Sequence, residues 1–345
     1  KYGAGEATLI HGTEVSPLTA TWNTRSVCFD YVNLQYGETY TIQYPAGFVQ
    51  DKSGNAAPAA SVTFTVMQRV APEARTFDAV VDHTLALAHG QSIAATADMP
   101  AQYRYIQDAI DAAPDNGTQP YLIFIREGYY NDPNWTFNDS YGNYYEGETI
   151  KNDLPSGINQ HDSCRIVWVN KPNIHLIGQD LAKVTIATDR LAGSVATDHS
   201  KAWYHVNAGA TIVVTEKGTG FHIENITIDN ENWTIHRMEG PQALCLRVRS
   251  DKTVFNNVRV RSYQDSYYSA SGYNRQFWYQ STIEGAVDFI YGDGEVFFES
   301  CTLDINRQSG GYIVAPNHKK ASTRWGYVFN NTRITTSYAT DPSTY

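Results

Sequence analysis

The sequence is poor in the residues and patterns that mark a metal-binding, nucleic-acid-binding or membrane protein. Its 26 basic residues are outnumbered by 36 acidic ones, and the formal net charge of −10 argues against nucleic acid or an anionic membrane surface as a partner. No apolar run reaches the ~18 residues that a membrane-spanning helix needs. The cysteines are few and lack metal-site spacing, so buried thiols are expected, with one disulfide left open; they are Cys28, Cys164, Cys245 and Cys301.

A Gly-x-Ser-x-Gly motif is also missing, which argues against a hydrolase of the Ser-His-Asp kind. The ten histidines follow no ligand pattern, so we expect neither a metal ion nor another cofactor. Aromatic residues, in contrast, make up 13% of the chain, with 24 tyrosines and seven tryptophans. Such side chains fill a hydrophobic interior, and they also stack on the apolar faces of sugar rings.

One strand pattern recurs five times between residues 221 and 334. The third position of the pattern is apolar, the fifth is polar, and the eighth is apolar again. The three sets are Ile223, Phe255, Trp278, Phe298 and Phe329; Asn225, Asn257, Gln280, Ser300 and Asn331; and Ile228, Val260, Ile283, Leu303 and Ile334. The repeats are 32, 23, 20 and 31 residues apart. Self-similarity at such a period predicts a solenoid in which each coil stacks on the next.

Amides and carboxylates recur at the same interval. Gln242 precedes Gln264 by 22 residues, and Asp265 precedes Asp288 by 23. Residues one coil apart should be neighbours, because stacked strands lie about 4.8 Å apart. The four side chains should therefore form one polar patch, in which two carboxylates cannot both ionise without cost.

These residues lie in motifs that resemble the pectin methylesterase (pectinesterase) family from about Thr76 to the end of the chain. The motifs are Gln242-Ala-Leu-Cys-Leu-Arg-Val, Tyr263-Gln-Asp-Ser-Tyr-Tyr, Arg275-Gln-Phe and Asp288-Phe-Ile-Tyr-Gly, in the family's order and spacing; Tyr105-Ile-Gln-Asp-Ala-Ile-Asp-Ala-Ala-Pro and Ile123-Phe-Ile-Arg-Glu-Gly-Tyr-Tyr resemble the family's N-terminal entry. The resemblance implies a right-handed parallel β-helix that removes methyl groups from esterified polygalacturonate, with pectin as the substrate.

The resemblance also implies a role for each polar residue. Asp288 matches the family's nucleophile, Asp265 matches its general acid and then base, and Gln242 and Gln264 match its oxyanion donors. An ionised Asp288 would raise the proton affinity of Asp265, so that one acid is charged and the other neutral. Two further positions match family residues that touch the sugar, namely Val287 and Tyr291, the latter in place of a usual Phe.

The expected fold class is all-β, with two domains. Residues 1–67 read as short alternating strands and turns that resemble a bacterial Ig-like β-sandwich module, which we expect to be incomplete. Residues 68–75 read as a linker, and 76–345 as the pectinesterase β-helix. A helix over 103–113 should cap the solenoid, and strands are expected at 122–125, 164–169, 173–177 and 211–214. A polar, tyrosine-rich insertion runs from 131 to 162.

A further family motif, Leu-Gly-Arg-Pro-Trp, is absent from these residues, so we expect a fragment of a longer esterase whose β-helix is truncated at its C-terminal end. We also expect a monomer without membrane insertion, located outside the cytoplasm (secreted, periplasmic or at the cell surface), whose signal peptide is not in this sequence. Two alternatives stay open: a polysaccharide lyase or glycosidase on the same solenoid, and a non-catalytic carbohydrate-binding β-helix.

Overall fold

The computed structural model describes residues 3–22, 27–30, 34–35, 37–51, 53–66, 75–131, 167–188, 210–235, 237, 239–240, 242–319 and 324–337. The chain forms two compact units, Lys1–Arg75 and Thr76–Tyr345. The predicted linker and the predicted insertion lie outside the described residues, except for Arg75 and Asn131. Within the described ranges, no helix is both long enough and apolar enough to cross a membrane.

The N-terminal unit is an antiparallel sheet with the strand order β3-β2-β1-β4-β5. Its strands are β1 (Ala7–His11), β2 (Glu14–Trp22), β3 (Val27–Asp30), β4 (Thr39–Tyr44) and β5 (Ala60–Thr65). The first part of β2 pairs with β1 and its last four residues pair with β3. The strands described here form one sheet, whereas an Ig-like sandwich has two that face each other, so the Ig-like fold stays a prediction.

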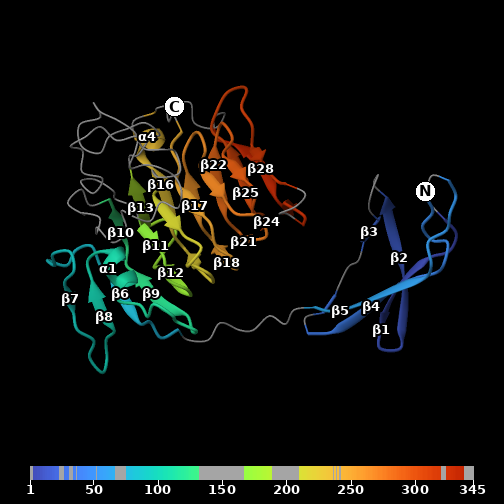
Figure 1. Ribbon diagram of the computed structural model, residues 1–345, viewed down its shortest axis with the longest axis horizontal. Helices are drawn as coiled ribbons and strands as arrows, with labels where there is room; N and C mark the ends of the chain where they lie inside the picture. Colours follow the sequence, from blue (N-terminus) through green and yellow to red (C-terminus); the bar gives the residue numbers. More distant parts are fainter. Residues whose placement is uncertain are drawn as a thin grey trace. The chain divides into compact units, whose positions relative to one another are not determined.

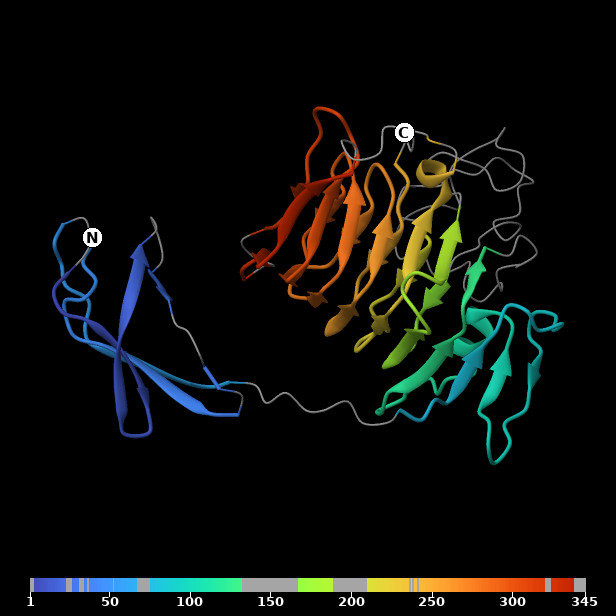
Figure 2. The same ribbon diagram turned by 180° about the vertical axis from the view of Figure 1, so that it is seen from behind.

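The second unit is a solenoid of three sheets whose strands are parallel except for β7, which pairs antiparallel with β8 (Figures 1 and 2). The first sheet holds β6 (Ala79–Val81), β7 (Ser92–Ile93), β8 (Ala101–Tyr103), β9 (Tyr121–Ile125), β12 (Ile174–Gly178), β15 (His222–Glu224), β18 (Thr253–Asn256), β21 (Arg275–Tyr279), β24 (Glu295–Glu299) and β27 (Tyr327–Asn330). The second holds β10 (Gly128–Tyr130), β13 (Val184–Thr188), β16 (Thr227–Asn230), β19 (Arg259–Arg261), β22 (Thr282–Gly285), β25 (Thr302–Ile305) and β28 (Arg333–Thr336). The third holds β11 (Val167–Val169), β14 (Ile212–Val214), β17 (Leu246–Val248), β20 (Tyr267–Ser269), β23 (Ile290–Gly292) and β26 (Val314–Pro316).

The coils follow one another in chain order, from the green strand β9 to the red strand β28 in Figure 1. The repeat read from the sequence is confirmed by the strand register, because Phe255 pairs with both Ile223 and Trp278, and Phe298 pairs with both Trp278 and Phe329. The polar fifth position forms the turn from the first sheet to the second. All five of its residues have positive φ, between 47° and 56°; they are Asn225, Asn257, Gln280, Ser300 and Asn331. Asparagine tolerates this left-handed conformation better than most residues, which explains its recurrence there.

The first sheet of the solenoid begins three strands before the strand that the sequence suggested, with β6, β7 and β8. The helix expected over 103–113 is the shorter α1 (Ile106–Asp111), which starts after β8. The strand expected at 122–125 is β9, but it is not the first buried strand, because the fully buried β6 pairs with it on its outer side. A strand of three residues shows no measurable alternation, so the sequence gives little sign of β6.

Stacked aromatic rings fill the interior of the later coils. Trp278 is completely buried, with its ring centroid 4.1 Å from that of Phe255 at an interplanar angle of 14°. Tyr267, from the third sheet, meets Trp278 edge-on at 4.9 Å. The two cysteines whose side chains are described, Cys245 and Cys301, are buried free thiols.

We predict that Trp278→Ala lowers the free energy of unfolding of the solenoid by about 3–5 kcal/mol, because it leaves a large cavity between two stacked rings. Its neighbour Phe277 is 38% exposed on the outer face of the same strand, and Phe277→Ala should cost about 1 kcal/mol or less. Urea unfolding followed by far-ultraviolet circular dichroism measures both variants. Equal losses for the two would show that the ring stack does not stabilise the solenoid.

Candidate active site

The predicted site residues lie on the turns that lead from the second sheet to the third. Gln242 precedes β17, Gln264 and Asp265 lie between β19 and β20, and Asp288 lies between β22 and β23. Because successive coils repeat the same path, these turns are stacked as the strands are. The site residues are therefore held at the entrance to three neighbouring strands of the third sheet.

Backbone hydrogen bonds fix which residues of the turns are neighbours. The amide of Asp265 donates to the carbonyl of Val287 at 3.0 Å, and Gln264 forms a parallel bridge with Val287. In a parallel ladder this pattern places Asp265 beside Asp288. The amide of Ala243 likewise donates to the carbonyl of Gln264 at 3.0 Å, which places Gln242 beside Gln264. The structure thus brings together the two acids on neighbouring coils and the two amides on neighbouring coils.

Both acids have a strained backbone. Asp265 has φ of 62° and Asp288 has φ of 49°, values in the left-handed region where most side chains are disfavoured. Such conformations persist only where the surrounding structure holds them, and they concentrate at functional sites. The two carboxyl groups therefore owe their orientation to the turns and not to the alternation of a strand.

Burial and the neighbouring charge of Asp288 raise the pKa of the Asp265 carboxyl to about 7, although a hydrogen bond with Gln264 opposes the shift. Asp265 is 8% exposed, whereas Asp288 is half-buried. A carboxyl group with such a pKa is partly protonated near neutral pH, so it can donate a proton and take one back. A buried acid that keeps its proton beside a more exposed acid is the arrangement that separates a general acid from a nucleophile.

The two predicted sugar-contacting residues flank the acids differently. Val287 is half-buried and packs against Trp233, Tyr263 and Ala286. Tyr291 lies on the outer face of the third sheet, since its neighbour Ile290 points into the core. Its ring stacks on that of Tyr268, one coil away, with centroids 4.6 Å apart and an interplanar angle of 7°.

Two residues near the site did not emerge from the sequence. Tyr268 could have been found by aligning the third-sheet strands, because it lies 23 positions before Tyr291. Trp233 could not, because it comes from the short helix α4 (Glu231–Thr234), which belongs to no repeat. Within the described residues, no three His, Cys, Asp or Glu side chains are arranged to hold a metal ion.

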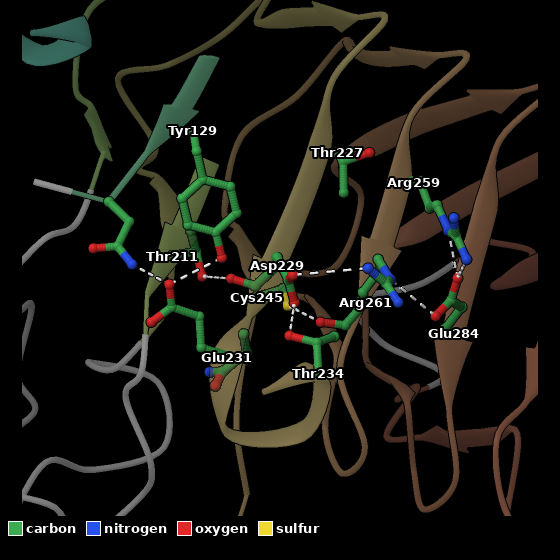
Figure 3. A network of polar contacts seen from close by, with 12 residues as sticks. Tyr129, Thr211, Thr227, Asp229, Glu231, Thr234, Cys245, Arg259, Arg261 and Glu284 are labelled. Atoms are coloured by element: carbon green, nitrogen blue, oxygen red, sulfur yellow. Dashed lines mark hydrogen bonds and ion pairs between the residues drawn. The ribbon is translucent and has the colours of Figure 1, made fainter. Parts of the chain in front are cut away.

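A row of charged side chains crosses the second sheet just before the site turns (Figure 3). Arg261 lies between two acids: its guanidinium is 3.9 Å from Asp229 and its Nε is 3.3 Å from Glu284. Arg259 also pairs with Glu284. Burial raises the pKa of Asp229 to about 6, although Arg261 and Thr234 oppose this. Arg261 and Glu284 each lie four residues before a site acid. The ion pairs of the row therefore connect the strands that lead into the site turns.

Comparison with known proteins agrees with the resemblance seen in the sequence. Residues 157–345 match the family model named Pectinesterase. A pectinesterase of Petunia integrifolia is 28% identical over 231 residues, which are 67% of this chain and 49% of that protein. The chain therefore spans about half the length of this curated relative.

Solved structures of similar fold include a pectin methylesterase from Erwinia chrysanthemi, with a TM-score of 0.57, 24% identity and coverage of 76% of this chain and 67% of that one. Another is a pectin methylesterase in complex with a hexasaccharide, with a TM-score of 0.56, 24% identity and the same coverage. These likenesses show that the solenoid is a parallel β-helix.

We predict that Asp265 makes the solenoid less stable as pH rises from about 4 to about 7. Its pKa is higher in the folded chain than the ordinary 3.8, so the folded state binds a proton that the unfolded state has already lost. The loss should be at most about 4 kcal/mol over this range, and it should disappear in Asp265→Asn. Urea unfolding at several pH values measures it.

Asp251→Asn is a control of opposite sign. A hydrogen bond from Arg275 lowers the pKa of Asp251, so this acid stabilises the fold above its unfolded pKa and ceases to do so as pH falls. If wild type and Asp265→Asn had parallel stability profiles while Asp251→Asn differed from both, the raised pKa of Asp265 would be disproved.

Proposed function

The chain belongs to the pectinesterase family, and from that premise we propose that it acts as a pectin methylesterase, hydrolysing the C6 methyl esters of polygalacturonate to carboxylate and methanol. One observation carries the proposal: two aspartates on neighbouring coils lie side by side, and two glutamines also lie side by side, Gln264 on the turn of Asp265 and Gln242 on the turn before it. Ester hydrolysis needs a nucleophile, an acid for the leaving alkoxide and donors for the oxyanion, and this set supplies all three.

In the first half of the reaction, Asp288 is the nucleophile. Its ionised carboxylate attacks the C6 carbonyl carbon, and the carbonyl oxygen becomes an oxyanion. The side-chain amides of Gln242 and Gln264 donate to this oxyanion without adding a positive charge beside the acids. Asp265, whose raised pKa keeps it partly protonated near neutral pH, gives its proton to the methoxide, and methanol leaves.

In the second half, the same residues hydrolyse the acyl-enzyme. Asp265 is now ionised and takes a proton from water, whose oxygen attacks the C6 carbonyl carbon of the anhydride that joins the sugar to Asp288. The bond to Asp288 breaks, which restores its carboxylate and frees the galacturonate product. The low solvent exposure of Asp265 serves both halves, because burial raises its proton affinity in each.

We place the sugar chain along the outer face of the third sheet. The stacked pair Tyr268 and Tyr291 offers an aromatic surface beside the acids, and Val287 lies next to the nucleophile in the sequence. Aromatic faces suit the apolar faces of sugar rings. An acidic chain is a poor general attractor for a polyanion, so local contacts of this kind would carry the binding.

The remaining expectations form part of the same proposal. Residues 1–67 would be an Ig-like module with a spacing or attachment role, 68–75 a linker, and 76–345 the catalytic β-helix. Because pectin is a polymer of the plant cell wall, the enzyme would act outside the cytoplasm. It would act as a monomer, since all four site residues come from one chain.

We predict that Asp288→Asn abolishes methanol release from esterified pectin, by at least about 10³-fold, while the fold persists. Asparagine is the preferred replacement, because it accepts the positive φ of this position more readily than alanine. Asp251→Asn, on the turn between the third sheet and the first, removes a carboxylate elsewhere and should keep full activity. An active, folded Asp288→Asn enzyme would exclude the proposed nucleophile.

The same assay separates the alternatives. An esterase releases methanol without shortening the polymer, a lyase or glycosidase shortens the polymer, and a binding solenoid does neither. Methanol is measured with alcohol oxidase and chain length by size-exclusion chromatography.

We predict that Gln242→Ala lowers kcat by about 10²–10³-fold and leaves KM nearly unchanged, because its amide acts mainly on the oxyanion. Steady-state kinetics on esterified pectin measure both constants. A rise in KM alone would assign Gln242 to ground-state binding instead.

A further inference from the structure

A small apolar cluster lies under the site turns, apart from the main core of the solenoid. It consists of Trp233, Tyr263 and Ala286, with Val287 packed against them, and we call it the turn cluster. The rings of Trp233 and Tyr263 have centroids 4.6 Å apart at an interplanar angle of 39°. Trp233 is the only member from outside the two acid-bearing turns, so it contacts them as an external support.

In each acid-bearing turn, the residue just before the functional side chains belongs to the turn cluster. Tyr263 immediately precedes Gln264 and Asp265, and Val287 immediately precedes Asp288. The two turns are also joined by their backbones, because the amides of Ala286 and Val287 donate to the carbonyl of Tyr263 at 2.6 and 3.2 Å. A shift of Tyr263 or Val287 would therefore move an acid that already has a strained backbone.

The helix that carries Trp233 is itself held by hydrogen bonds at both of its ends (Figure 3). The carboxylate of Glu231 accepts a hydrogen bond from the hydroxyl of Tyr129 at 2.9 Å and another from the side chain of Asn131. At the other end of α4, the hydroxyl of Thr234 donates to Asp229 at 2.9 Å. These bonds connect α4 to β10 and to β16, so the position of Trp233 is set by the second sheet.

Trp233 is poorly placed to be a sugar-binding surface. It is 5% exposed, and the guanidinium of Arg237 lies over its ring, 5.6 Å from the centroid. A ring that is 5% exposed is too well covered by protein to stack on a substrate. Trp233 instead contacts residues of both acid-bearing turns, and so links them to α4.

We propose that Trp233 is a positioning residue of the esterase site: by packing against Tyr263 and Val287 it sets the separation and orientation of the two aspartates, and Glu231 and Tyr129 hold it in place. This inference rests on the proposed function. It adds a support that comes from outside the repeating coils, since α4 belongs to none of the three sheets.

The first test compares Trp233→Phe and Trp233→Ala with wild type in kcat, KM and the pH profile of methanol release. We expect kcat to fall about 3–10-fold for Trp233→Phe and more than about 10-fold for Trp233→Ala, with KM changed less than twofold, because misalignment by about an ångström costs mainly the chemical step. Trp278→Phe is the matched control, since it also trims a buried tryptophan but packs in the main core against Phe255 and Phe298 and not in the turn cluster. It should lose stability and keep its kcat at temperatures where it is folded.

The second test removes the support without opening a cavity. Tyr129→Phe deletes only the hydroxyl that binds Glu231, so it should fold even if Trp233→Ala does not. We expect kcat to fall about 2–5-fold at unchanged KM. Wild-type kcat and pH profiles in folded Trp233→Phe and Tyr129→Phe would overturn the proposal.

A third measurement separates this inference from the proposed function. The titration of the Asp265 carboxyl can be followed by NMR without any turnover, and in Trp233→Phe we expect its pKa to move down from about 7 as the loosened turn admits water. A wild-type enzyme that releases no methanol refutes the proposed function alone. An unchanged Asp265 titration in Trp233→Phe refutes the positioning role alone.

Discussion

The parallel pairing of neighbouring coils is the interaction on which the solenoid and its site both depend. Neighbouring coils are joined by the backbone hydrogen bonds of three sheets. In the later coils, aromatic rings also stack in the interior of the solenoid, as Phe255 does on Trp278. The same register continues into the turns, where the amide of Asp265 binds the carbonyl of Val287. One set of contacts therefore determines both the stability of the coils and the distance between the two acids.

The electrostatics of the site follow from that register. A pair of carboxyl groups held one strand apart, with one of them nearly buried, cannot both ionise without cost, and the structure resolves the conflict by leaving Asp265 protonated up to about pH 7. In the charged row of Asp229, Arg261 and Glu284, two acids also lie close together, but an arginine between them compensates their negative charge. Two neighbouring parts of one solenoid thus use the same spacing either to neutralise acids or to keep one of them reactive.

Much of this could be predicted from the sequence because the fold is periodic. The apolar and polar columns fixed the register, and the spacings of Gln242, Gln264, Asp265 and Asp288 placed them on adjacent turns. Aperiodic parts were harder: β6 is too short to show alternation, and Trp233 reaches the site from a helix outside the repeat. The pKa of Asp265 needed the structure as well, because burial is its largest cause and the sequence carries no measure of burial.

The location of the acids on two consecutive coils gives the site a particular resistance to partial melting. In a solenoid each coil touches only its neighbours, so fraying begins at an end and advances coil by coil. Asp265 and Asp288 depend on a single coil-to-coil interface, with stacked coils on both sides of it. Unfolding of the outermost coils would leave that interface intact. The two aspartates would lose their relative position only when unfolding reached their own coils.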